Sequence, residues 1–230
     1  MQEPIYSIKN LSISNNEHKV LSINKFDLHR GAMYLFNGYI GSGKTTLMQI
    51  LSKEKYVEKG MVFYEATDIS KISKTKYNKD IVYLAEVNNR PWFAGKVKDF
   101  IINKIKNQSK NKNYEDIFRK ICNSMKISKI ILDSKISSLS EGEYRWILLA
   151  SSIAVDSKVL IIDYLDKYID SNKKIILNRV LKRKTSYDGV TIIATSYNPD
   201  HFRMSSSVNI QIDRGRITQV RSSSNNNKRK

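Results

Sequence analysis

Several residue types that define well-known protein classes are scarce in this chain. Among its 230 residues there are one cysteine, three prolines and nine glycines, and no apolar run approaches the ~20 residues that span a bilayer. A lone cysteine excludes an internal disulfide, and we interpret Cys122 as a buried core thiol. Residues 1–9 lack the basic start and apolar run of a secretory signal, so we expect a cytoplasmic protein.

Acidic residues are also few, since 22 Asp and Glu stand against 40 Lys and Arg, for a formal net charge of +18. A basic surface concentrates polyanions, which would favour nucleic acid or an anionic membrane. However, lysine, asparagine, isoleucine, serine and tyrosine are abundant along the whole chain, as a genome rich in A and T would produce at tolerant surface positions. We therefore do not expect nucleic acid as a partner, while lipid headgroups or an acidic partner stay open.

The length favours a single α/β domain with an inserted subdomain. Runs of β-forming residues predict strands at 5–8, 20–26, 33–36, 61–64, 81–84, 159–162, 190–194 and 208–212. The runs 159–162 and 190–194 are almost continuously apolar, which is typical of parallel strands covered on both faces. Residues 96–154 show helical periodicity and no strand pattern, so we predict a helical insertion there.

One glycine-rich motif, GxxxxGKT, carries most of the chemical information. It comprises Gly38, Tyr39, Ile40, Gly41, Ser42, Gly43, Lys44, Thr45 and Thr46. The glycines let backbone N–H groups surround phosphates, Lys44 reaches the outer phosphates, and the Thr45 hydroxyl can ligate Mg²⁺. A strand at 32–36 and a helix at 45–51 flank the motif as this reading requires. The motif predicts nucleoside triphosphate binding, with an ordinary glycine-rich turn as the alternative.

A carboxylate follows the buried run 159–162 directly. Asp163 therefore emerges at the carboxyl end of a parallel strand, where open α/β sheets place their ligands. Together with the phosphate motif, this position predicts that Asp163 orients Mg²⁺ or its water. The alternative is an aspartate that caps the following turn.

The segment Leu139-Ser140-Glu141-Gly142-Glu143 lies between these two features, and with it the chain resembles the ABC ATPase family, whose signature there is LSGGQ. The hairpin pattern at 212–217 matches as well. The resemblance implies a P-loop NTPase layered α/β fold with a mostly parallel core sheet, an N-terminal antiparallel β region and an inserted α-helical subdomain. It implies one ATP-binding domain at 1–220, with the helical subdomain at about 87–155, and we expect 221–230 to be a basic disordered tail.

The family pairs two domains head to tail, with ATP between the phosphate loop of one and the signature of the other. By resemblance, Ser140, Gly142 and Glu143 occupy signature positions and Asp170 matches a dimer contact. Glu141 and Glu143 replace Gly and Gln, which adds negative charge near a triphosphate and should weaken the sandwich. Ser140 and Glu143 can also be read simply as a helix capping box.

The chain departs from the family at the positions that carry hydrolysis. Tyr164 stands where the family has the Glu that activates water, and Ser196 stands where it has the γ-phosphate-sensing His. A phenol is a poor base at neutral pH. Glu86 takes the place of the Gln near Mg²⁺ and could still ligate the metal. The family's adenine-stacking aromatic would fall near Asn15, where this chain has no tyrosine. Asp166 is rejected as a substitute base, because three residues past the strand end the chain should have turned away from the site. No catalytic position is intact, so we expect slow hydrolysis or none.

The leading hypothesis is an ATP-binding subunit of an ABC-type transporter that binds ATP and Mg²⁺. By resemblance, its partners are integral membrane subunits and a second ABC ATPase, which places it at the cytoplasmic face of a membrane. The stretch 91–97 resembles the surface that meets the membrane partner, although Trp92 could instead pack a helix entry. The alternatives are a soluble non-transport ABC-type ATPase, acting in nucleic-acid maintenance or cofactor assembly, and a pseudoenzyme with a structural nucleotide.

Overall fold

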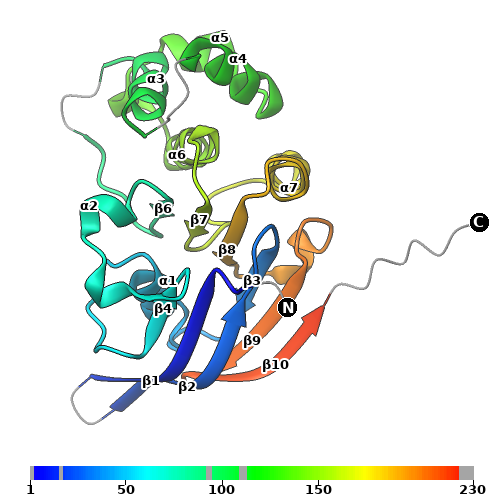
Figure 1. The fold of residues 1–230 in the computed structure, drawn as a ribbon. Helices are drawn as coiled ribbons and strands as arrows, with labels where there is room; N and C mark the ends of the chain where they lie inside the picture. Colours follow the sequence, from blue (N-terminus) through cyan, green and yellow to red (C-terminus); the bar gives the residue numbers. More distant parts are fainter. Residues whose placement is uncertain (1–2, 16–17, 92–94, 109–112, 223–230) are drawn as a thin grey trace, which may run out of the picture.

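A computed structural model describes residues 3–15, 18–91, 95–108 and 113–222. Two sheets and a set of helices make up the molecule (Figure 1). The elements are β1 (Tyr6–Asn15), β2 (His18–Leu28), β3 (Met33–Asn37), α1 (Lys44–Leu51), β4 (Val62–Tyr64), β5 (Thr67–Asp68), η1 (Ile69–Lys71), α2 (Lys74–Tyr77), β6 (Ile81–Leu84), α3 (Val97–Gln108), α4 (Tyr114–Ser124), α5 (Lys129–Asp133), η2 (Ile136–Ser138), α6 (Glu141–Ala154), β7 (Val159–Ile162), α7 (Ser171–Ser186), β8 (Thr191–Thr195), η3 (Pro199–Phe202), β9 (Val208–Asp213) and β10 (Arg216–Ser222).

The larger sheet has the strand order β10-β9-β3-β8-β7-β6. Its strands from β9 to β6 pair in parallel, and β10 joins the edge antiparallel. Side chains of β7 alternate between two cores, with Val159 and Ile161 on one face and Leu160 and Ile162 on the other. Both faces are therefore covered, as the apolar run predicted.

The smaller sheet is antiparallel and has the order β2-β1-β4-β5. Side chains of its strands share one core with those of α1 and one face of the larger sheet, so α1 lies between the two sheets. β1 and β2 are longer than the predicted runs 5–8 and 20–26. Their extra residues include many exposed polar side chains, which pair along the hairpin without a buried face to reveal them.

Helices α3, α4, α5 and α6 follow one another between β6 and β7 and lie above the sheet in Figure 1. Together with α7 they cover the second face of the larger sheet. Almost every side chain of α6 is buried, because this helix packs against both the sheet and the neighbouring helices. Residues 92–94, the aromatic part of the predicted membrane-partner surface, lie outside the described residues, as do residues 109–112.

The predicted start of the tail at residue 221 is wrong, because the last strand continues past it. β10 pairs with β9 as far as Ser222, whose partner is Val208, so Arg221 and Ser222 are not part of a disordered tail. The cause is the open edge of β9, which offers backbone hydrogen bonds that composition alone does not reveal. Residues 223–230 lie outside the described residues. No helix in the described part of the chain is both long and apolar enough to cross a membrane.

Candidate nucleotide-binding site

The phosphate motif forms a loop between the end of β3 and the start of α1. Three of its glycines have positive φ angles, 149° at Gly38, 81° at Gly41 and 99° at Gly43. A Cβ on Gly38 would lie 2.1 Å from the Ile212 carbonyl oxygen, and one on Gly43 would lie 2.7 Å from that of Val20. The loop is therefore wedged between β2 and β9 and requires glycine at both positions.

Lys44 turns back over this loop. Its ammonium donates to the Gly38 carbonyl at 2.7 Å and the Tyr39 carbonyl at 2.9 Å, and the residue is only 3% exposed. Burial lowers the pKa of Lys44, while Asp163 and Glu86 act in the opposite direction. The loop carbonyls thus hold the cation at the point where the outer phosphates of a nucleotide would need it.

Asp163 lies fully buried at the carboxyl end of β7. Its Oδ1 accepts a 2.6 Å hydrogen bond from the Thr195 hydroxyl, whereas Oδ2 has no hydrogen-bond partner among the described residues. Burial raises the pKa of Asp163, and the neighbouring Thr195 and Thr45 hydroxyls oppose this effect. A buried carboxylate oxygen that lacks a partner, beside a threonine hydroxyl, is the donor set that Mg²⁺ uses with substrate phosphates. These residues therefore fit the ion.

Glu86 has other partners. Its Oε1 pairs with Lys167 Nζ at 2.9 Å and accepts from the Tyr197 hydroxyl at 3.2 Å. Within the described residues, no group of three or more His, Cys, Asp or Glu side chains is arranged to hold a metal ion. The predicted metal residues Thr45, Asp163 and Glu86 would therefore need phosphate or water oxygens to complete a Mg²⁺ shell.

Tyr164 forms an aromatic stack at this end of the sheet. Its ring lies against that of Tyr197 with a centroid separation of 4.2 Å and an interplanar angle of 29°. The Lys44 ammonium lies 5.7 Å from the Tyr164 ring centroid. Burial, followed by the charges of Asp163 and Glu86, raises the pKa of Tyr164. The phenolate, the only form that could act as a base, is therefore even less populated at neutral pH than in an ordinary tyrosine.

Ser196 is buried, and its hydroxyl donates to Asp166 Oδ2 at 2.9 Å. Asp166 also accepts hydrogen bonds from the backbone N–H groups of Tyr197 and Asn198 at 3.0 Å each. The expectation that the chain turns away from the site before Asp166 is wrong, because this carboxylate holds the turn after β8. Its two oxygens are occupied by the donors of that turn.

The signature segment forms the N-terminus of α6. Ser140 and Glu143 make a capping box, in which the Ser140 N–H donates to Glu143 Oε2 at 2.8 Å and the Glu143 N–H donates to Ser140 Oγ at 3.2 Å. A Cβ on Gly142 would lie 2.7 Å from the Tyr168 carbonyl oxygen. Arg90 pairs with Glu141 at 2.7 Å. The Glu141 carboxylate is therefore partly neutralised by a neighbour.

Arg145 is a residue that the sequence analysis missed. It is buried on α6, and its guanidinium donates to the carbonyls of Ala85 at 2.6 Å, Asp163 at 2.7 Å and Tyr164 at 3.0 Å. Burial lowers the pKa of Arg145 to about 10. The arginine thus ties the signature helix to the ends of β6 and β7. Arg145 is a charged residue within the apolar pattern of this helix, and that position could have indicated a buried arginine with specific partners.

Asp170 begins α7 as its N-cap, accepting from the Lys173 N–H at 2.8 Å. The structure thus brings the phosphate loop, Asp163, Glu86, Tyr164 and Ser196 to the same end of the larger sheet. The signature residues and Asp170 lie at the starts of α6 and α7 instead. In a single chain these residues cap helices.

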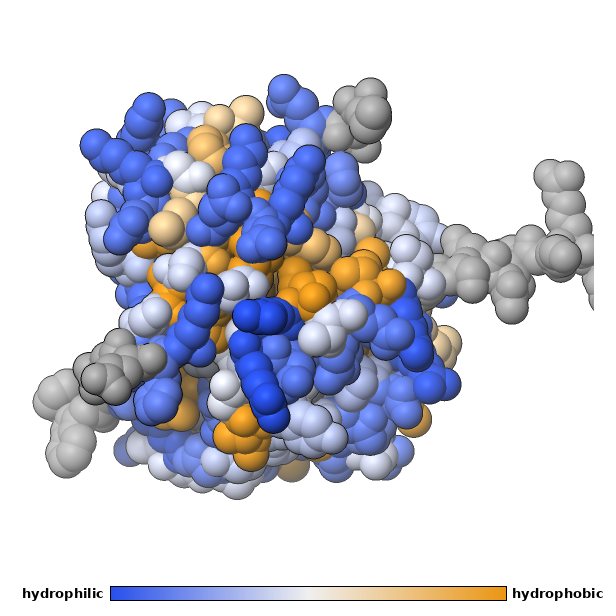
Figure 2. Space-filling model, turned by 90° about the horizontal axis from the view of Figure 1, so that it is seen from below, coloured by the Kyte–Doolittle hydropathy of each residue, from blue (hydrophilic) through white to orange (hydrophobic). Residues whose placement is uncertain are grey.

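The turn between β9 and β10 lies at the lower end of the molecule in Figure 1, and Figure 2 views the molecule from that side. Hydrophobic residues gather in the middle of this face, with strongly hydrophilic ones around them (Figure 2). In the phosphate loop, the side chains of Tyr39 and Ile40 are 81% and 88% exposed. The rim of the loop therefore offers apolar contacts to a ligand or partner.

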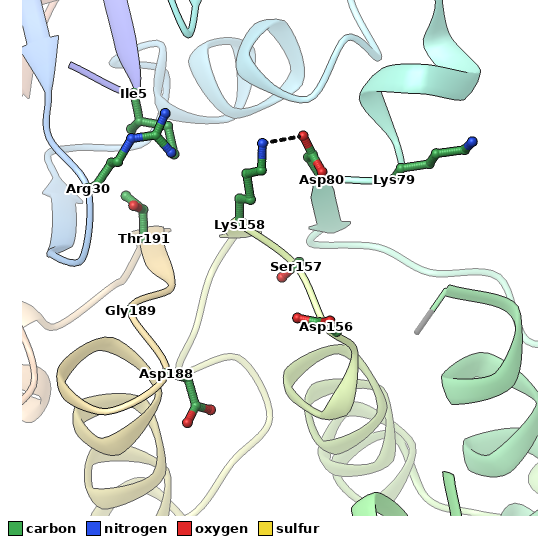
Figure 3. Close-up of a pocket in the computed structure, with 10 residues that line it drawn as sticks. All are labelled: Ile5, Arg30, Lys79, Asp80, Asp156, Ser157, Lys158, Asp188, Gly189 and Thr191. Atoms are coloured by element: carbon green, nitrogen blue, oxygen red, sulfur yellow. Dashed lines mark ion pairs between the residues drawn. The ribbon is translucent and has the colours of Figure 1, made fainter. Parts of the chain in front are cut away.

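A polar pocket of about 210 Å³ lies at the opposite end of the sheet (Figure 3). It is formed where β6, β7 and β8 begin, and Lys158 points toward Asp80 with a separation of 3.0 Å. Lys158 also pairs with Glu65 at 3.1 Å, and Arg30 pairs with the same carboxylate at 2.6 Å. These mutual ion pairs hold the strand starts together and leave the phosphate loop as the stronger candidate site.

The geometry defines a P-loop nucleotide-binding domain with an added antiparallel sheet and a helical insertion. The sequence profile of the family described as ABC transporter matches residues 21–164, more than half of the chain. The chain belongs to this family, which binds ATP. The predicted fold class is therefore confirmed.

Related proteins are similar along most of the chain. The probable iron export ATP-binding protein FetA of Escherichia coli (strain K12) is 24% identical over 225 residues, covering 96% of this chain and 98% of that protein. The energy-coupling factor transporter ATP-binding protein EcfA2 of Staphylococcus epidermidis (strain ATCC 12228 / FDA PCI 1200) is 25% identical over 197 residues, covering 84% and 69%. These similarities agree with the family match.

Solved structures share the fold. The dimeric ATP-binding cassette MJ0796, bound to ADP and Pi in a post-hydrolysis state, superimposes with a TM-score of 0.82 at 15% identity, covering 94% of this chain and 98% of that one. CbiO1 of Clostridium perfringens, part of the ABC transporter complex cbiONQ, gives a TM-score of 0.78 at 20% identity, covering 96% and 90%. At these identities the likeness concerns the fold alone.

Proposed function

We propose that this chain is the ATP-binding subunit of an ABC-type transporter, and that its own phosphate loop binds Mg-ATP but supports little hydrolysis. It pairs head to tail with a second ABC ATPase and acts on integral membrane subunits at the cytoplasmic face of a membrane. The family match supports this role, as do relatives whose names describe an iron export ATP-binding protein and an energy-coupling factor transporter ATP-binding protein.

The contrast within one site carries the proposal. The phosphate loop has its glycines and Lys44 in place, while Tyr164 and Ser196 stand where a base and a phosphate sensor are expected. The phenol stays protonated at neutral pH because its pKa is raised. The Ser196 hydroxyl is engaged with Asp166. Loss of a positioned base costs about 10²–10⁴ in rate, so binding survives without efficient chemistry.

The residues of the chain divide the work of binding. Lys44 leaves the carbonyls of Gly38 and Tyr39 to meet the outer phosphates, and the backbone N–H groups of the loop surround them. The Thr45 hydroxyl and Asp163 Oδ2 would hold Mg²⁺, which supplies positive charge between the phosphates. Each of these groups binds or orients the nucleotide, and none of them is a base.

The signature would serve the ATP of the partner. The N-terminus of α6, with Ser140 at its cap, presents backbone N–H groups and a positive dipole end to an anion. Glu143 remains within the capping box and Glu141 stays paired with Arg90, which limits their repulsion of phosphate. Pairing is therefore weaker than with a neutral signature, but it is not abolished.

Calorimetry and phosphate release on the purified chain test the nucleotide part of the proposal. We expect heat of binding with Mg-ATP and turnover at background. Tyr164→Glu should raise turnover only when a partner ATPase supplies its signature. Ser196→His is a weaker second variant, because Ser196 is 1% exposed and the larger ring would strain the turn. Rapid phosphate release by the unmodified chain alone would overturn the proposal, and so would the absence of binding heat.

Isolation from native cells tests the transporter part. We expect multi-span membrane proteins to accompany the chain, together with an ATPase that carries Glu after its strand-end Asp. The competing function is a soluble ABC-type ATPase, favoured by the net charge of +18. The ATP-binding protein Uup of Buchnera aphidicola, whose name mentions no transporter, is 25% identical over 222 residues, which cover 34% of its length. Tight, salt-dependent nucleic-acid binding without membrane partners would favour that function.

A further inference from the structure

A groove of about 930 Å³ runs along the outer face of α7. Its walls come from one face of α7, from η3 and from the turn that follows η3. None of its lining residues belongs to the phosphate loop, the signature or the ends of β6 and β7. The lining residues are Ile175, Asn178, Arg179, Lys182, Arg183, Ser186, Tyr187, Asp200, His201 and Met204. α7 lies at the outside of the molecule in Figure 1, so the groove is open to a partner.

Large apolar side chains are exposed in this groove. Ile175 is 59% exposed, Tyr187 is 83% exposed and Met204 is 76% exposed. Ile175 lies near the start of α7 and Tyr187 just beyond its end, so exposed apolar side chains stand at both ends of the helix. Exposed apolar residues gathered in one groove, and not scattered singly, indicate a surface that another molecule covers.

The charges of the groove that have no ion-pair partner among the described residues are all positive. Arg179, Lys182 and Arg183 are exposed on the same face of α7, and none of them makes an ion pair with any residue that the structure describes. The one carboxylate in the lining, Asp200, is already paired with Arg203 at 2.9 Å. An occupant would therefore gain most by bringing carboxylates to three unpaired cations.

The groove is held open by an internal hydrogen-bond cluster. Asn178 is buried in its floor, and its amide donates to the carbonyls of Lys174 and His201. Its Oδ1 accepts from the Ser205 hydroxyl at 2.8 Å. These bonds fix α7 against the turn after η3. A preformed surface loses less entropy on binding than one that must first be ordered.

We propose that this groove docks an acidic amphipathic helix of a protein partner. The concave apolar floor suits the apolar face of a helix, and the cations along its rim suit flanking carboxylates. A flat bilayer would not fill a concave groove, and a nucleic acid would not need its exposed apolar side chains. Docking here is independent of ATP binding, so a partner could hold this subunit through α7 in any nucleotide state.

The test uses an acidic peptide of about 18 residues, with Leu at helical spacing and Glu on the flanks, which as a helix is ~27 Å long. Fluorescence anisotropy compares it with a scrambled peptide and with a version carrying Lys in place of Glu. We expect saturable binding of the acidic helix alone. Hydrogen exchange should slow in segments 175–187 and 199–205 when the peptide is bound.

Variants locate the contact. The double substitution Arg179→Ala and Arg183→Ala should weaken binding about tenfold or more and reduce its salt dependence, and Ile175→Ser should weaken it at unchanged salt dependence. The matched control is Arg119→Ala with Lys129→Ala, which removes the same charge at exposed positions outside the groove and should change nothing.

Equal binding of the scrambled peptide would overturn the proposal, as would affinity that is insensitive to the groove variants. Stronger binding to phosphatidylserine vesicles or to single-stranded RNA, lost in the same double variant, would also overturn it and assign a different occupant.

Discussion

The phosphate loop and the residues that follow β7 and β8, Tyr164 and Ser196, lie at the same end of one sheet, yet their surroundings differ. The loop keeps Gly38 and Gly43 in positions where a Cβ would meet backbone atoms, and Lys44 donates to the loop carbonyls. The cluster instead contains Tyr164 stacked on a second tyrosine and Ser196 bonded to a carboxylate. The difference shows that a fold can hold a phosphate loop in a demanding geometry while the neighbouring strand ends are occupied by contacts with one another.

Lys44→Ala should give the largest effect. Without the ammonium the outer phosphates lose a charge-assisted contact of about 1.5–3 kcal/mol, so the affinity for Mg-ATP should fall about 10–100-fold or more. Isothermal titration calorimetry measures this affinity. Lys55→Ala, an exposed lysine beyond α1, is the control and should bind normally. Unchanged affinity in the Lys44 variant would remove the loop from the binding site.

Gly43→Ala should come next, as a loss of stability. The residue has a φ of 99°, and its Cβ would lie 2.7 Å from Val20 O and from Leu21 Cδ2. Strain and overpacking together should cost about 2–4 kcal/mol, lowering the melting temperature by several degrees. Gly60→Ala has a similar φ of 84° with no atom within 4 Å, so it should cost about 1 kcal/mol. Equal losses of unfolding free energy in the two variants would contradict the tight packing of the phosphate loop between β2 and β9.

Asp163→Asn should separate binding from stability. Because burial raises the pKa of Asp163 in the folded state, the ionised carboxylate lowers stability at neutral pH. The variant should therefore be more stable at pH 7 by on the order of 1 kcal/mol, while Mg²⁺ no longer tightens its ATP binding. The stability difference should close as the pH falls toward the ordinary pKa of aspartate near 3.8, since the native carboxyl is then protonated. A variant that still responds to Mg²⁺ would exclude Asp163 as its ligand.

Tyr164→Phe should have the smallest effect. The ring keeps its stack on Tyr197, and the lost hydroxyl is not a base because its pKa is raised above that of an ordinary tyrosine. Phosphate release at pH 6–9 should stay within about twofold of the unmodified chain. A clear fall in rate, or a titration in this range that the variant lacks, would show that the phenol takes part in chemistry.

Local sequence signals predicted the parts of the molecule that depend on near neighbours. The apolar run 159–162 indicated a doubly covered strand, and the spacing of Ser140 and Glu143 indicated the capping box that begins α6. Both features involve residues within a few positions of one another, whose geometry is set by helix or strand periodicity.

The remaining site features depend on strand order, which the sequence does not state. Glu86 meets Lys167 only because β6 and β7 are neighbours, and these residues are 81 positions apart. The stack of Tyr164 on Tyr197 likewise needs β7 beside β8. Arg145 donates to carbonyls from two strands, and no side-chain pattern marks a carbonyl as a partner. The contact of Asp166 with Ser196 was not predicted either, because it also depends on β7 lying beside β8.

The contacts between the phosphate loop and the hairpin of β9 and β10 have a consequence for folding during translation. Ser42 O accepts a 3.0 Å hydrogen bond from the Gly215 N–H, and Gly38 rests against the Ile212 carbonyl. Residues 38–46 are translated long before residues 212–215, whose backbone shapes the phosphate loop. Nascent chains that end before β9 therefore carry the whole motif without the backbone groups that support it.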